Sequence, residues 1–246
     1  MLTLKDRLWR IKQGVADRAD RRARLHFLHI GKNAGTQIKF IARHVNLSSA
    51  TIRIVSHTHS VALRDLPDAE PFFFAIRRPD DRFKSGFYSR KRKGQPRIYT
   101  EWSPHEAQAF AAFDHANDLA EALFEEGDTG FKALCAIKSI SHCSMEQINW
   151  FDRRGYFLKI REPVGIIRQE HFTQDMGALA RKLGFDIAAG EDPADKAAHR
   201  NDYSGAPPLS DKARRNLRDW YRQDFEFYAR CEEWISNRSV PQDKAQ

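Results

Sequence analysis

Four short apolar runs most strongly constrain the fold of this 246-residue chain. They lie at residues 25–30, 51–55, 71–76 and 165–168. Continuous apolar runs of this length are typical of strands that are buried on both faces. Helical periodicities separate them, which favours βαβ units. The sequence therefore predicts an α/β fold with a central parallel sheet flanked by helices.

The first apolar run leads into a short loop of small residues around one lysine. The run ends at Gly31, and a helical periodicity begins at Thr36. A strand, a tight loop and a helix N-terminus form a natural anion site, because the first N–H groups of a helix lack partners. Lys32 precedes Gly35, so the loop does not fit the nucleotide-binding pattern G-x-x-x-x-G-K-[ST]. An ordinary strand-to-helix turn is the alternative interpretation.

Polar side chains also follow the second and third runs. His57 and His59 come after the second run, Arg77 after the third, and Ser85 lies two turns into the next helix. The carboxyl ends of parallel strands meet at one edge, so we expect these groups near Lys32. Residues two apart in an extended segment point to the same side, which predicts two imidazoles facing one pocket. They suit general-base chemistry on a hydroxyl. A metal site is the rival interpretation, but it needs further ligands.

The charge balance favours an anionic partner. The chain has 41 basic and 33 acidic side chains, a net charge of +8. Solubility alone is the alternative explanation. Three cysteines without metal-ligand spacing, together with charges that interrupt any signal peptide near the start, indicate a reducing, cytoplasmic setting. Peripheral contact with a membrane is a further option for the first residues.

The chain divides into three parts. Residues 1–24 have the pattern of a basic amphipathic helix, which either packs on the domain or lies on an anionic membrane. Residues 25–235 form one globular domain, and residues 236–246 form a polar tail. Within the domain, the basic cluster at residues 90–93, with Arg97, either meets an anionic substrate or is a solvated helix end.

Two motifs resemble those of a known enzyme family. Residues 29–36, His-Ile-Gly-Lys-Asn-Ala-Gly-Thr, resemble the H-I-P-K-T-G-G-T loop of sulfotransferases that use 3′-phosphoadenosine 5′-phosphosulfate (PAPS). Residues 77–88 resemble that family's 3′-phosphate motif, R-D-P-x-x-R-x-x-S-x-Y. The likeness points to the carbohydrate branch that includes heparan sulfate 2-O-sulfotransferase, whose His-x-His is matched by His57 and His59. With similar phrases at 164–172 and 220–228, it extends over about residues 25 to 235.

The resemblance implies a P-loop-like three-layer sandwich and a specific reaction. A sulfuryl group would pass from PAPS to a hydroxyl of a carbohydrate or glycolipid, for which an anionic acceptor is one option. No metal and no nucleic acid would take part. His57 would take the acceptor proton, and His59 would orient the site or share that role. The residues that would hold the donor are Lys32, Asn33, Ala34, Gly35 and Thr36 at the 5′-phosphate and Arg77 and Ser85 at the 3′-phosphate.

Some positions depart from the family pattern, and two other functions stay open. Gly31, Asn33 and Ala34 replace Pro, Thr and Gly of the loop, and Arg78 replaces an acidic residue of the second motif. A kinase-like phosphotransferase would require Mg²⁺ and bind ATP rather than the product 3′-phosphoadenosine 5′-phosphate (PAP). A non-catalytic nucleic-acid-binding protein would show steep salt dependence. The oligomeric state is left open.

Overall fold

The computed structural model describes residues 20–96, 98–151, 155–187, 203 and 205–239. The predicted α/β fold is confirmed, and each apolar run contains one strand. The strands are β1 (Ala23–Leu28), β2 (Ile52–Ser56), β3 (Phe72–Ile76) and β4 (Gly165–Arg168). They pair in parallel in the order β2-β1-β3-β4. The loops that follow β1, β2 and β3 therefore meet at the carboxyl end of the sheet.

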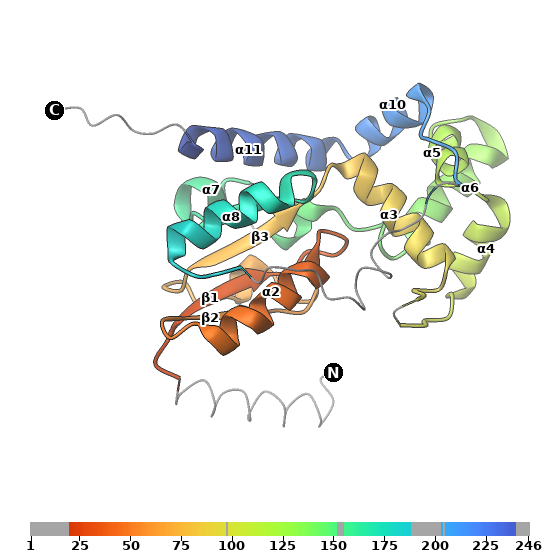
Figure 1. The fold of residues 1–246 in the computed structure, drawn as a ribbon. Coiled ribbons are helices and arrows are strands. Elements are labelled where there is room, and N and C mark those ends of the chain that lie inside the picture. Colours follow the sequence, from red (N-terminus) through yellow and green to blue (C-terminus); the bar gives the residue numbers. More distant parts are fainter. Residues whose placement is uncertain (1–19, 97, 152–154, 188–202, 204, 240–246) are drawn as a thin grey trace.

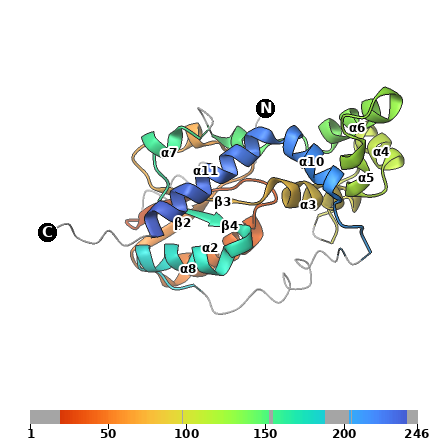
Figure 2. The same cartoon turned by 90° about the horizontal axis from the view of Figure 1, so that it is seen from above.

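Helices cover both faces of the sheet. Helices α2 (Gly35–Ser48) and α8 (Phe172–Leu183) pack on one face, where Ile38 and Leu179 join the side chains of Leu25 and Phe27. Helix α8 ends at Gly184, which adopts the left-handed conformation that is common after a helix. Helix α11 (Arg222–Ser239) and the short helix α7 (Phe157–Ile160) lie on the other face (Figure 2). This arrangement is a three-layer sandwich.

A separate group of helices extends beyond the end of β3 (Figures 1 and 2). It is built from α3 (Pro79–Lys91), α4 (Pro104–Ala112), α5 (Ala116–Ala122), α6 (Gly127–Ser139) and α10 (Asp211–Trp220). These helices share one apolar core. The apolar pattern of residues 105–125 would suit one helix, but the chain is extended at Phe113 and forms α4 and α5 instead. The apolar pattern from residue 210 to 228 would likewise suit one final helix, which is divided at Tyr221 into α10 and α11.

The boundaries of the domain differ from the prediction at both ends. Of the predicted helix 1–24, residues 1–19 lie outside the described residues, while Ala23 and Arg24 belong to β1. Arg22 bonds Asp20 and the carbonyl oxygens of Asn46 and Ser49, so this segment is tied to the domain. At the other end, α11 runs to Ser239, beyond the predicted start of the tail at residue 236. None of the described helices has a stretch long and apolar enough to span a bilayer.

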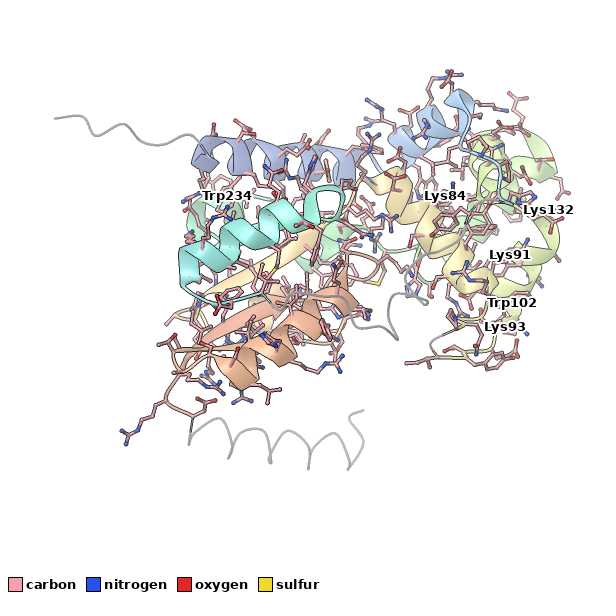
Figure 3. The ribbon with its side chains drawn as sticks, viewed as in Figure 1. Lys84, Lys91, Lys93, Trp102, Lys132 and Trp234 are labelled. Atoms are coloured by element: carbon pink, nitrogen blue, oxygen red, sulfur yellow. The ribbon has the colours of Figure 1, made fainter. Side chains whose placement is uncertain are left out.

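Most of the basic cluster at residues 90–93 is paired with carboxylates. Arg90 is buried and binds both carboxylate oxygens of Glu106, at 2.7 and 2.8 Å. Lys91 pairs with Asp114, and Lys93 pairs with Glu101. Figure 3 places Lys91 and Lys93 in the separate helical group. These contacts favour a structural role for the cluster over both alternatives, contact with an anionic substrate and a solvated helix end. Arg97 lies outside the described residues.

Candidate active site

The loop between β1 and α2 has a backbone that most side chains disfavour. Lys32 has a φ of 70° and Ala34 a φ of 52°, both in the left-handed region. Such conformations cost free energy and cluster at functional sites. Ala34 precedes α2 and offers no side-chain oxygen to its first N–H groups. The positive end of the α2 dipole therefore faces the loop without a side-chain cap from this residue.

Gly35 lets a histidine ring lie directly on the start of α2. A Cβ atom at this position would lie 1.7 Å from Nε2 of His29. The His29 side chain is buried, and its Nδ1 has no hydrogen-bond partner among the described residues. In an ordinary strand-to-helix turn, a glycine would serve for its backbone freedom. The structure shows instead that its missing side chain is what allows this contact.

The sequence predicts that Asn33 helps to hold the donor, but its side chain points into the interior of the protein. Its side chain is fully buried, and its Nδ2 donates to Oε1 of Gln147 at 2.6 Å and to the carbonyl oxygen of Ala75 at 2.9 Å. Gln147 also accepts from the backbone N–H of Arg77 and donates to its carbonyl oxygen. This side-chain pair ties the loop to the end of β3.

Asp224 of α11 adds a second connection, because it binds the backbone at Gln147. Its carboxylate is fully buried and accepts from the backbone N–H groups of Gln147 at 2.8 Å and Ile148 at 2.9 Å. Burial raises the pKa of Asp224, against the attraction of Arg82 and these hydrogen bonds. Sequence reasoning missed Gln147 because its partners are 70 or more residues away along the chain.

Arg82 brings a buried positive charge to the loop. The residue is 4% exposed, and its guanidinium donates to the carbonyl oxygens of Gly31 at 3.0 Å and Met145 at 2.6 Å. In the part of the chain that the structure describes, no carboxylate lies within ion-pair distance of it. Burial lowers the pKa of Arg82, while attraction to Asp224 opposes the effect. A buried cation held by carbonyl groups favours the approach of an anion.

Arg77 and Ser85, the two residues predicted to hold the 3′-phosphate, differ in exposure. Arg77 follows β3 and is half-buried, and its repulsion contributes to the lowered pKa of Arg82, so the two guanidinium groups act on the same region. Ser85 lies on α3 and is 2% exposed, so its hydroxyl is inside the molecule. Arg78 pairs with Asp80 and Asp81, which offsets the extra charge noted in the sequence.

The structure gives the two predicted catalytic histidines different partners. The ring of His59 packs on His29, with centroids 3.9 Å apart, and lies over Gly31. The ring of His57 stacks on His26, with centroids 5.0 Å apart. The sequence predicted one pocket for both imidazoles. Their contacts instead place His59 on the loop and His57 against β1.

His59 has the features of a general base. Its Nδ1 lies 3.2 Å from the carbonyl oxygen of His29, which can only accept a hydrogen bond. The neutral ring then carries its proton on Nδ1 and a lone pair on Nε2. Loss of water around the ring lowers the pKa of His59, and Lys39, Lys32 and Arg82 lower it further, against the hydrogen bond to His29. The imidazole is therefore neutral near pH 7 and can take a proton.

His142 is a site residue that sequence reasoning left without a role. Burial lowers the pKa of His142 to about 3, and Lys32, Arg82 and His59 contribute to the shift. A Cβ at Gly86 of α3 would lie 3.0 Å from the Cβ of His142, so the glycine allows this loop to approach α3. In the sequence, the glycine within this helix was a signal for such a close approach, but it does not show which residue approaches.

Together these residues form a positively charged site with neutral imidazoles. Lys32, Arg77 and Arg82 supply the charge, and His59 and His142 supply nitrogens that are unprotonated at neutral pH. Within the described residues, no group of three or more histidine, cysteine or acidic side chains is arranged to hold a metal ion. The arrangement suits an anion that bears a group transferable to a hydroxyl.

The chain matches no protein-family model and no curated protein. A functional assignment therefore rests on the site geometry and the two sequence motifs.

Proposed function

We propose that this protein is a sulfotransferase that moves a sulfuryl group from PAPS to a hydroxyl of a carbohydrate or glycolipid. One observation supports the proposal most. The loop around Lys32 lies at the start of α2, beside the buried cation of Arg82, and carries the neutral imidazole of His59 on its surface. An anionic donor and a hydroxyl acceptor need those two features side by side.

Each group has a role in the proposed transfer. The first N–H groups of α2 and the Lys32 ammonium hold the 5′-phosphosulfate, and Arg77 holds the 3′-phosphate by paired donors. His59 takes the acceptor proton at Nε2. The hydroxyl oxygen then forms a bond to sulfur while the bond from sulfur to the 5′-phosphate oxygen breaks. Lys32 neutralises the charge that PAP gains as it leaves. The contacts of His59 make it, rather than His57, the proposed proton acceptor.

Calorimetric titration with PAP tests the donor site. The wild-type protein is expected to bind PAP without Mg²⁺, and Lys32→Ala is expected to weaken binding about 10- to 100-fold, because a charge-assisted hydrogen bond is lost. Lys132→Ala is the matched control, since Lys132 pairs with Asp128 on α6, in the separate helical group (Figure 3). Tighter binding of ATP with Mg²⁺ than of PAP would instead favour a phosphotransferase.

A screen of methyl glycosides and glycolipids with labelled PAPS then identifies the acceptor.

PAP binding is expected to take up protons. Burial is the largest cause of the low pKa values of His59 and His142, and the cations of the site lower them further, so a bound anion offsets that part of the shift. The pKa values of both imidazoles therefore rise in the complex, so uptake occurs at a pH between the free and bound values. Affinity for PAP should therefore increase as the pH falls below neutrality. Titrations at pH 6 in buffers of different ionisation enthalpy measure the uptake. Net proton release on PAP binding would contradict the placement of PAP beside His59 and His142.

A further inference from the structure

Three side chains form a hydrogen-bonded row along the face of the sheet opposite α2. His26 lies between Leu25 and Phe27, whose side chains face α2 and α8, so its own side chain points to the other face. Its Nδ1 lies 2.7 Å from Nε2 of His57. Its Nε2 bonds Oε2 of Glu70, and the other carboxylate oxygen of Glu70 bonds Arg24. The row runs from Glu70, just before β3, to His57, just after β2.

The row fixes where the protons are. The pKa of Glu70 is lowered by its bonds to His26 and Arg24 against the opposing effect of burial, so the group is a carboxylate that only accepts. When the His26 ring is neutral, its one N–H is on Nε2, where it donates to Glu70, and its lone pair is on Nδ1. His57 must donate to that lone pair from its own Nε2. The lone pair of neutral His57 is therefore on Nδ1, the nitrogen that no described residue binds.

Nδ1 of His57 lies at the same end of the sheet as the candidate active site. His57 directly follows β2, and its backbone N–H still bonds Phe27 of β1. Lys39 of α2 lowers the pKa values of His57, His29 and His59 alike, so one ammonium acts on all three rings. The charged and titratable groups that act on His57 are thus His26 and Lys39, with Glu70 and Arg24 behind His26. Burial is the largest cause of the low pKa of His57, about 4.

We propose that Glu70, His26 and His57 form a proton relay that keeps Nδ1 of His57 unprotonated, as a second nitrogen that accepts a hydrogen bond from a hydroxyl of the sulfuryl acceptor. Glu70 and His26 are positioning residues in this relay. If Nδ1 takes a proton, the Nε2 proton of His57 passes to Nδ1 of His26. The positive charge then faces the Glu70 carboxylate, away from Lys39. The identity of the hydroxyl-bearing molecule rests on the proposed function, whereas the proton positions do not.

Imidazole ¹⁵N NMR on the whole protein tests the relay without any ligand. At pH 7, His57 is expected to carry its proton on Nε2, with resonances assigned from His57→Gln. Glu70→Gln should lower the pKa of His57 further, because the negative charge behind His26 is lost. Arg24→Gln is the matched control, since it breaks the same ion pair but leaves the carboxylate on His26. A proton on Nδ1 of His57 at pH 7, or equal shifts in the two variants, would overturn the relay.

Steady-state kinetics with the acceptor found in the screen test the role of Nδ1. His57→Ala should raise the acceptor KM about 3- to 10-fold, as expected for one lost hydrogen bond, and leave the PAP affinity unchanged. A loss in kcat as large as that of a His59 variant, at constant KM, would make His57 the base and overturn this role. Absence of PAP binding would refute the sulfotransferase proposal, and the NMR result would still decide the relay.

Discussion

Replacing His59 by alanine is expected to lower kcat for sulfuryl transfer by about 10²–10⁴-fold, the usual value of an aligned general base. The hydrogen bond from Nδ1 to the His29 carbonyl oxygen orients the ring and leaves Nε2 free to accept a proton. Burial is the main reason that the imidazole is neutral, and Lys32 and Arg82, which add to this effect, stay in place when the ring is removed. PAP affinity should therefore remain close to that of the wild type, which separates loss of the base from loss of the donor site.

Two control variants sharpen the interpretation of the His59 result. His105→Ala removes an exposed imidazole on α4 and should leave kcat unchanged. His57→Ala removes the ring that stacks on His26 and should act on the acceptor KM instead. Single-turnover rates with saturating PAPS provide the measurement. A His59→Ala variant with wild-type kcat, or one whose PAP affinity collapses, would show that this residue is not the proton acceptor.

The strands could be predicted because their environment is simple. Phe72, Phe73 and Phe74 are all buried, so β3 lacks the alternation of an exposed strand and stands out as one apolar run. The breaks at Phe113 and Tyr221 could not be predicted in the same way. Both residues are buried in the core of the separate helical group, so the apolar pattern continues through each break. Only packing between helices decides where the chain turns.

The sequence could predict only those site residues that are placed by the end of a strand. Lys32, Arg77 and His59 follow strand ends, and parallel strands bring those ends together. Asn33 has the same position, yet its side chain turns inward to Gln147, 114 residues away. Likewise, the relay depends on Glu70, which lies 44 residues from its partner His26. Such pairings between distant residues leave no local pattern, so a polar residue in a loop can equally bind a ligand or hold the loop.

Gly35→Ala should cause the largest loss of PAP binding among single-atom changes to the loop. The added Cβ would lie 1.7 Å from Nε2 of His29, closer than any real contact, so the ring or the start of α2 must move. Overpacking of this kind costs about 1–3 kcal/mol, and the displaced N–H groups belong to the proposed 5′-phosphate site. We expect PAP affinity to fall about 10- to 100-fold, which corresponds to that range. Calorimetry and thermal unfolding measure the two effects.

Gly177→Ala is the matched control for this substitution. The new Cβ in α8 would meet only Nη1 of Arg181, at 3.5 Å, an ordinary contact. It should stabilise the protein by about 0.5–1 kcal/mol, because alanine favours helix more than glycine does, and leave PAP binding unchanged. The double variant with His29→Ala and Gly35→Ala removes the ring that the new methyl group meets. It should therefore recover PAP affinity relative to Gly35→Ala alone. If it does not, the glycine serves the ligand directly rather than making room for His29.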